Sequence, residues 1–237
     1  MKKILFTRAI DMAYKSILHN AGFEVLEYNF LKTTPLPSAQ ADILKELPHF
    51  KNLVFTSQHA VKIFFAYLNS SQLNSLKLNS LKLKYHIFST SEATKDLIEK
   101  YGHSPTLSAP SAKVLAQLML EKADLSVGVH FLCGNLSLPH LPDILSKNGV
   151  LVKKVAVYET VATPLSISEP FDAIAFLSLS AADSFLQANT LKPDTLIFTL
   201  GQTTADYVRK KTGAKRIFAA KKPTISALID LILTECT

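Results

Sequence analysis

The fold of this chain is decided by two similar segments, Val54-Phe55-Thr56-Ser57-Gln58-His59-Ala60 and Ala175-Phe176-Leu177-Ser178-Leu179-Ser180-Ala181. Each is a short apolar run that reaches a serine and then opens a helical pattern. The two serines, Ser57 and Ser178, lie in opposite halves of the chain. A repeat at this distance is much longer than a solenoid repeat, so it indicates a duplicated domain.

Two further pairs of segments repeat in a staggered order. Ile87 to Thr94 corresponds to Ile197 to Thr204, and Ile4 to Arg8 with Gly22 corresponds to His130 to Gly134 with Gly149. In each segment a short apolar strand is followed by an amphipathic helical pattern. Strands that alternate with helices in this way predict an α/β protein with parallel sheets covered on both faces.

Short apolar runs mark the expected strands, at residues 4–6, 23–26, 53–55, 86–88, 129–132, 152–157, 174–177, 196–199 and 216–218. The low-complexity stretch 72–84 is expected to be a surface helix or loop. Two stretches rich in threonine and proline, 33–37 and 158–165, interrupt the pattern at matching places of the repeat. We therefore predict one lobe of residues 1–34 plus 164–237, an inserted lobe of residues 37–160, and hinge linkers at 33–37 and 158–165.

The charge of the chain favours an anionic partner. The 237 residues carry a formal net charge of +7. The basic residues are scattered and not interleaved with aromatic residues, so we expect no nucleic-acid binding. The N-terminus meets Thr7, Arg8 and Asp11 too soon for a signal sequence, and no apolar run is long enough to span a membrane. The expected location is the cytoplasm.

Neither cysteine suggests metal or redox chemistry. Cys133 and Cys236 form no Cys-x-x-Cys pair, and the seven histidines do not cluster. Cys133 follows an apolar strand and is expected to be a buried small hydrophobic residue. We expect no metal and no organic cofactor.

Taken together, these segments resemble the uroporphyrinogen-III synthase family over nearly the whole chain. The resemblance is carried by these motifs, in order: Leu5-Phe6-Thr7-Arg8, Phe55-Thr56-Ser57 with Ala60-Val61, Cys133-Gly134-Asn135-Leu136, Val157-Tyr158-Glu159-Thr160, Ser178-x-Ser180-Ala181, Gly201-x-Thr203-Thr204-Ala205 and Pro223-Thr224 with Ala227-Leu228.

The resemblance implies a fold and a reaction. The fold is two flavodoxin-like lobes joined by two linker strands, with a central cleft. The reaction closes the linear tetrapyrrole hydroxymethylbilane, with loss of water and inversion of ring D, and gives uroporphyrinogen III for heme biosynthesis. The bilane carries eight carboxylates, so the positive charge of the chain would attract the substrate. The resemblance also implies a monomer, with possible transient contact with the preceding enzyme of the pathway.

Tyr158 is the catalytic candidate. It matches the tyrosine that is thought to assist departure of the hydroxyl group in this family, and a phenol is protonated at neutral pH and can donate. The simpler interpretation is a tyrosine at a strand end whose ring packs and whose hydroxyl reaches water.

The substrate-binding candidates are Arg8, Ser57, Thr94, Ser178, Thr203 and Thr204. All follow expected strands. Free N–H groups at helix starts bind carboxylates, and an arginine can pair with a carboxylate in two-pronged fashion. The simpler interpretation of the serines and threonines is helix capping. Near Thr94 the chain departs from the family pattern, with Ser91 at the glycine position and Lys95 at the alanine position. It departs again after Gly134, where Asn135 to Leu138 stand in place of the arginine or acidic pair that many members carry.

Two other functions fit the same pattern. A non-catalytic, two-lobed protein that binds an anion or a tetrapyrrole needs the same lobes and hinge. A regulatory or partner-binding descendant of the synthase would explain the departures near Ser91 and Asn135.

Overall fold

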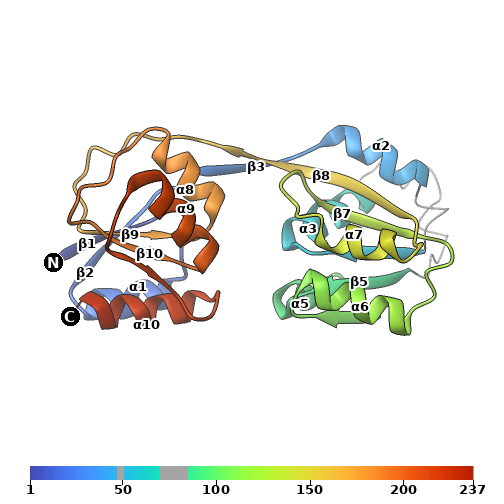
Figure 1. Cartoon of the computed structure of the whole chain (residues 1–237). Coiled ribbons are helices and arrows are strands. Elements are labelled where there is room, and N and C mark those ends of the chain that lie inside the picture. The colour runs from blue at the N-terminus through green and yellow to red at the C-terminus, as the bar shows by residue number, and fades with distance from the viewer. Residues whose placement is uncertain (47–50, 70–84, 237) are drawn as a thin grey trace. The chain divides into compact units, whose positions relative to one another are not determined.

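The computed structural model describes residues 1–46, 51–69 and 85–236, so the stretch expected to be a surface helix or loop, 72–84, lies outside the described residues. The chain divides into two compact units. Unit 1 comprises Met1–Lys32 and Val161–Thr237, and unit 2 comprises Thr33–Thr160 (Figure 1).

Unit 1 is built on one parallel sheet. Its elements are β1 (Lys2–Phe6), α1 (Met12–Asn20), β2 (Phe23–Glu27), β9 (Ala173–Phe176), α8 (Leu179–Leu186), β10 (Leu196–Thr199), α9 (Gln202–Thr212), β11 (Ile217–Ala219) and α10 (Ile225–Cys236). The strand order is β11-β10-β9-β1-β2, with parallel pairing throughout. Numbered within the unit this is the order 2-1-3-4-5, which flavodoxin-like sheets share.

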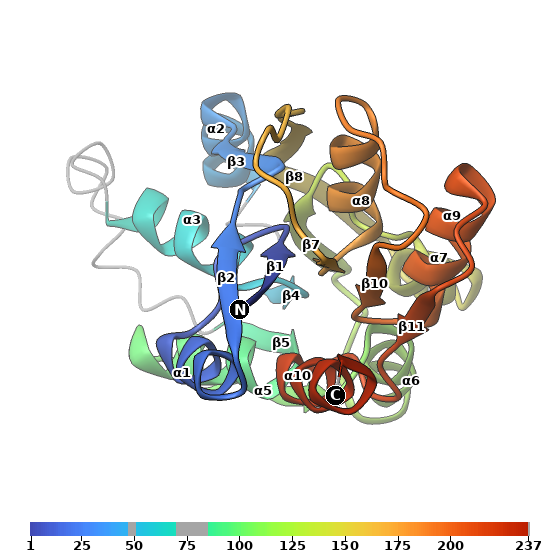
Figure 2. The same ribbon diagram turned by 90° about the vertical axis from the view of Figure 1, so that its left-hand side faces the viewer.

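Alternate side chains of these strands enter two cores. Ile4 and Phe6 of β1 pack with residues of α1 and α10, whereas Leu5 packs with residues of α8 and α9. Helices therefore cover both faces of the sheet, and Figure 2 shows α1 beside α10 on one of them. This is the burial that near-continuous apolar strands such as Ile4-Leu5-Phe6 require.

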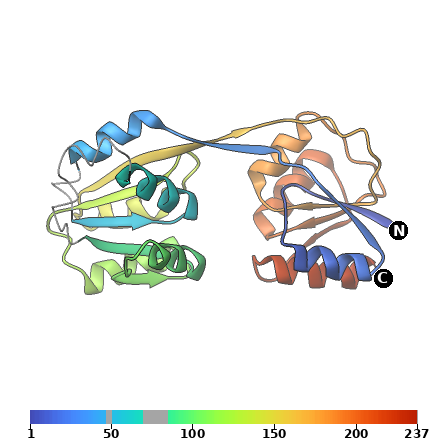
Figure 3. The same cartoon turned by 180° about the vertical axis from the view of Figure 1, so that it is seen from behind.

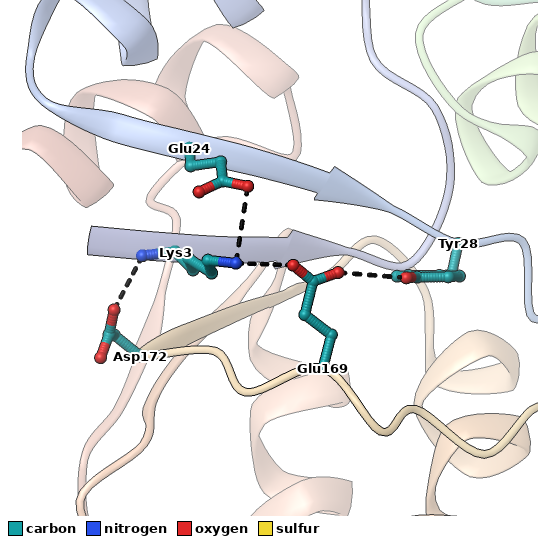
Figure 4. Close-up of polar contacts among 5 residues, drawn as sticks. All are labelled: Lys3, Glu24, Tyr28, Glu169 and Asp172. Atoms are coloured by element: carbon teal, nitrogen blue, oxygen red, sulfur yellow. Dashed lines mark hydrogen bonds and ion pairs between the residues drawn. The ribbon is translucent and has the colours of Figure 1, made fainter. Parts of the chain in front are cut away.

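A polar cluster fixes the segment that leads into β9 (Figure 4). The Lys3 ammonium lies 2.6 Å from a carboxylate oxygen of Glu169 and 3.6 Å from one of Glu24. Tyr28 donates to the other oxygen of Glu169 at 3.5 Å, and the Lys3 backbone N–H donates to Asp172 at 2.7 Å. The hydrogen bond with Glu169 raises the pKa of Lys3. These contacts join β1, β2 and the chain before β9, which are far apart in sequence.

Unit 2 is built on a second sheet. Its elements are β3 (Leu31–Pro35), α2 (Pro37–Glu46), β4 (Asn52–Phe55), α3 (Gln58–Leu68), β5 (His86–Thr90), α5 (Glu92–Lys100), β6 (Leu107–Ala109), α6 (Ala112–Lys122), β7 (Val129–Gly134), α7 (His140–Lys147) and β8 (Val152–Ala162). The strand order is β3-β8-β7-β4-β5-β6, with parallel pairing from β8 to β6. Residues of α2, α3 and α5 pack on one face, and residues of α6 and α7 on the other. The predicted α/β class with two parallel sheets is confirmed.

Two strands carry the chain between the units, as Figure 3 shows from behind. β3 begins in unit 1 and ends in unit 2, and β8 does the reverse. The threonine- and proline-rich stretches are therefore largely strand, and β8 continues past the predicted end at residue 157. Their backbone groups are satisfied because the two strands are neighbours in the sheet, where the hydroxyls of Thr33 and Thr160 lie 3.3 Å apart.

No helix within the described ranges is long and apolar enough to cross a lipid bilayer.

Candidate functional site

The strand order of unit 2 reverses between β4 and β7. From β4 the sheet continues through β5 to β6 on one side, and from β7 to β8 on the other. In open parallel sheets, ligands bind outside the carboxyl ends of the strands at such a reversal. A pocket of about 370 Å³ lies there, and its polar lining residues are Thr56, Ser57, Thr90, Ser111, Ser137, His140, Tyr158 and Thr160. No Asp, Glu, Lys or Arg is among the described residues that line it.

A β-bulge brings Tyr158 to this pocket. Cys133 of β7 pairs with Ala156, but the next residue, Gly134, pairs with Tyr158. Val157 is therefore the extra residue of β8, and Tyr158 takes the place opposite Gly134. Bulges commonly redirect a side chain next to a functional site.

Gly134 leaves the space that the ring of Tyr158 occupies. A Cβ atom at position 134 would lie 2.4 Å from Cε2 and 2.9 Å from the hydroxyl oxygen of Tyr158. Both distances are shorter than non-bonded contacts permit. The glycine is thus required by the position of the tyrosine and not by the backbone angles of the turn.

Ser57 forms the partner of Tyr158. The Tyr158 hydroxyl donates to Ser57 Oγ at 3.0 Å, and the same oxygen accepts the His59 backbone N–H at 3.1 Å. Ser57 is thus both the N-cap of α3 and a contact of the phenol, and its capping interpretation is confirmed. The exposed His59 ring lies 5.6 Å from the Tyr158 ring, centroid to centroid.

Asn135 fastens the end of β8 beside the pocket. Its Oδ1 accepts the Thr160 N–H at 2.8 Å, and its Nδ2 donates to the Thr160 carbonyl at 3.3 Å. Its own N–H donates to the Tyr158 carbonyl at 3.1 Å. The amide therefore extends the β7–β8 ladder beyond the bulge, where the strands would otherwise separate.

Thr94 is placed differently from Ser57. It is 2 % exposed, and its hydroxyl lies 3.0 Å from that of Ser91, the N-cap of α5. Ser91 keeps a positive φ of 61°, a conformation that favours glycine, so the residue at the family's glycine position retains the backbone shape of a glycine. The Thr94 N–H donates to Ser91 Oγ at 3.3 Å, so Ser91 is the cap and Thr94 is the residue that it caps.

The candidates in unit 1 gather at the carboxyl edge of its own sheet. Exposed Arg8 follows β1 and Ser178 follows β9, so they flank the reversal of strand order between those two strands. Thr203 and Thr204 lie in the first turn of α9, after the neighbouring β10; Thr203 is exposed and Thr204 is 7 % exposed. Ser178 Oγ accepts the Ala181 N–H at 3.2 Å and caps α8.

Four pocket residues were not recognised from the sequence: Thr90, Ser111, Ser137 and His140. A signal existed for Ser111, because it follows the short strand β6 and opens α6, as Ser57 follows β4 and opens α3. Cys133 is completely buried, as expected, and burial raises the pKa of its thiol.

The fold and the site define a class of protein: two α/β units, one of which has a pocket lined by hydroxyl groups where its strand order reverses. The family model "HEM4: Uroporphyrinogen-III synthase HemD" matches residues 12–230. The chain belongs to the uroporphyrinogen-III synthase family, whose members are cyclising lyases of heme biosynthesis. This assignment supports the enzyme and not the non-catalytic alternative. No curated protein sequence matches the chain.

Solved structures agree in fold. The uroporphyrinogen-III synthetase of Helicobacter pylori 26695 is 23% identical, with a TM-score of 0.71, and the match covers 99% of this chain and 100% of that one. A mutant uroporphyrinogen III synthase from the extremely thermophilic bacterium Thermus thermophilus is 16% identical, with a TM-score of 0.65 and full coverage of both chains. The wild-type Thermus enzyme in another crystal form has a TM-score of 0.51 at 16% identity, and the match covers 100% of this chain and 98% of that one.

Proposed function

We propose that this chain cyclises hydroxymethylbilane to uroporphyrinogen III through the pocket at the carboxyl edge of unit 2, with Tyr158 as the acid. The observation that carries the proposal is the placement of the Tyr158 hydroxyl, 3.0 Å from Ser57, in a pocket whose described lining contains no carboxylate. A substrate with eight carboxylates meets no like charge on that lining.

The first step is loss of the hydroxyl group. The phenol proton of Tyr158 passes to the departing hydroxyl, water leaves, and an azafulvene cation remains on the bilane. Ser57 Oγ accepts a hydrogen bond from the Tyr158 hydroxyl in the free protein and directs the phenol until the substrate oxygen replaces it as acceptor. Attack of ring D at its substituted position then gives a spiro-pyrrolenine. The original bond to ring D breaks, a new bond forms at its other side so that the ring is inverted, and the proton lost as the closed ring regains aromaticity returns to the Tyr158 phenolate.

The remaining candidates hold carboxylate arms. Ser57 offers the N-terminus of α3, and Ser178 that of α8, with Thr203 and Thr204 at the start of α9 and Arg8 after β1. Donors of both lobes hold the same substrate, and the chain segments 33–37 and 158–165 serve as the hinge. Positioning of this kind supplies most of the rate enhancement, because the water-loss step is chemically easy.

Action as a cytoplasmic monomer, with transient contact with the enzyme that supplies the bilane, belongs to the same proposal. The family assignment motivates these points, and the +7 charge suits the anionic substrate. Sedimentation of the purified chain alone and mixed with that enzyme tests both points.

The test of the function is ring closure of freshly prepared hydroxymethylbilane, with separation of the isomers after oxidation. We expect type III product in excess over the type I product that forms spontaneously. Type I alone, from folded protein, contradicts the proposal.

A further inference from the structure

The pocket in unit 2 has a second group of donors, away from Tyr158. Thr90 is the last residue of β5, and it pairs with Ala109, the last residue of β6. Ser111, two residues after Ala109, is the N-cap of α6. The register of β5 and β6 therefore brings the Thr90 side chain to the start of α6, and both Thr90 and Ser111 line the pocket.

Thr90 is buried without a hydrogen-bond partner for its hydroxyl. The residue is 7 % exposed, and its Oγ1 bonds to no other atom in the described part of the chain. Its neighbour Ser89, by contrast, pairs with Ser108 at 2.6 Å. Thr90 Oγ1 is not among the fully buried, unpartnered atoms of the described residues, and a hydroxyl that lines a pocket without a protein partner is available to a ligand.

The start of α6 supplies the matching donors. The Val114 N–H is capped by Ser111 Oγ at 3.4 Å. The N–H groups of Ala112 and Lys113, in the first turn of this 11-residue helix, have no partner inside the helix, because the first turn never provides one. The partial positive charge of a helix start and the absence of a carboxylate from the described lining both select an anion.

Apolar surface adjoins these donors. Phe131 lines the pocket, and Leu136 and Leu138 line it while remaining 56% and 67% exposed. Exposed leucines beside polar donors suit a ligand that joins a carboxylate to a flat apolar ring. A pyrrole with an acetate or propionate arm has this chemistry.

We propose that the α6 side of the pocket is a carboxylate subsite for one acetate or propionate arm of the substrate. The Thr90 hydroxyl and the N–H groups of Ala112 and Lys113 donate to the carboxylate, and the pyrrole ring that bears it packs on Leu136. The subsite rests on the proposed function for the identity of its ligand, but its carboxylate chemistry does not depend on turnover.

The kinetic test uses Thr90→Val, which removes the hydroxyl and keeps the shape. We expect KM for hydroxymethylbilane to rise about tenfold with kcat within about twofold, because the arm is held equally in the ground state and the transition state. Thr90→Ser, which keeps the hydroxyl, should restore KM. Thr195→Val is the matched control, since Thr195 is 5 % exposed and lies at the amino end of β10 in unit 1.

A binding measurement separates the subsite from the enzymatic function. Titration with uroporphyrin, which carries eight carboxylates, should give a Kd about tenfold weaker for Thr90→Val than for wild type and Thr90→Ser. If wild type makes no type III product but this difference in Kd remains, the proposed function fails and the subsite stands. Equal Kd and KM for wild type and Thr90→Val overturn the subsite, and so does a Thr90→Ser variant as impaired as Thr90→Val.

Discussion

At the scale of single residues, Tyr158 has the most direct connection to chemistry. Tyr158→Phe removes the hydroxyl that we propose as the acid and leaves the ring in place. Because positioned acids contribute about a hundredfold or more, we expect kcat for ring closure to fall about a hundredfold. Stability should change by no more than about 1 kcal/mol, since one hydrogen bond to Ser57 is lost.

Stopped-flow measurement of bilane consumption checks this prediction, with thermal unfolding of the same samples. Tyr14→Phe is a suitable control, because Tyr14 is a partly buried tyrosine of α1 in the core of unit 1. Unchanged turnover in Tyr158→Phe would remove the tyrosine from the mechanism.

Gly134 permits a second prediction at this scale. Gly134→Ala places a Cβ 2.4 Å from the Tyr158 ring, so the ring must leave its position and its contact with Ser57. We expect turnover to fall at least tenfold, with a loss of about 1–3 kcal/mol in unfolding free energy from overpacking. Kinetics and urea unfolding of the purified variant measure both effects.

The matched control is Gly201→Ala. A Cβ at position 201 meets nothing within 4 Å, and φ there is −168°, which any residue adopts. This variant should keep its stability to within about 0.5 kcal/mol, as a surface change away from packed groups does. Equal effects of the two substitutions would show that the contact between Gly134 and Tyr158 is unimportant.

At the scale of elements, the start of α5 carries backbone strain. Ser91 adopts φ 61° and ψ 148°, a region that is nearly restricted to glycine and costs about 1–3 kcal/mol for other residues. Ser91→Gly relieves this strain. Loss of the serine cap costs a few tenths of a kcal/mol, and the greater conformational freedom of glycine in the unfolded chain costs about 0.5–1 kcal/mol. We expect a net stabilisation of about 1 kcal/mol.

Urea unfolding measures the change in unfolding free energy of Ser91→Gly, and Ser111→Gly is the control. Ser111 is also an N-cap serine, but its backbone is extended, with φ −148° and ψ 160°. The second variant loses a cap and relieves no strain, so it should be slightly destabilised. A destabilised Ser91→Gly would mean that its hydroxyl contacts outweigh the strain.

The order of strands and helices could be predicted from the sequence because each element is indicated by the pattern of residues within its own segment. Apolar runs that reach Ser57 and Ser178 and then change to a helical period identify both strand-to-helix turns. The bulge at Val157 could not be predicted, since it is set by the pairing of β8 with β7. For the same reason the role of Gly134 and the contacts of Asn135 with Thr160 were missed.

Burial explains the other difference at this scale. Thr94 and Thr204 occupy matching places in the repeat, and both were expected to be donors. The structure buries both at the first turn of a helix, and Thr94 also pairs with Ser91. A pattern of residue types gives the position in the turn, but not whether the hydroxyl is already occupied.

At the scale of the whole molecule, unit 2 is continuous in sequence and has its own sheet and two cores. A fragment of residues 33–160 should therefore fold alone and unfold in one cooperative transition. Circular dichroism during thermal unfolding and a dispersed NMR spectrum check this prediction. A fragment without cooperative unfolding would show that unit 2 needs unit 1 in order to fold.

The fragment should lack ring-closure activity, because the candidates Arg8, Ser178, Thr203 and Thr204 all belong to unit 1. Activity in the fragment would contradict the proposal that both units hold the substrate.

Strand β8 both carries Tyr158 and connects unit 2 to unit 1. Tyr158 lies three positions before Val161, where the chain passes into unit 1, and the Asn135 side chain clamps Thr160 between them. These two hydrogen bonds tie the backbone of Thr160 to unit 2, immediately before the chain enters unit 1. Tyr158, the proposed acid, can therefore lie close to the passage between the units while its backbone is held by unit 2.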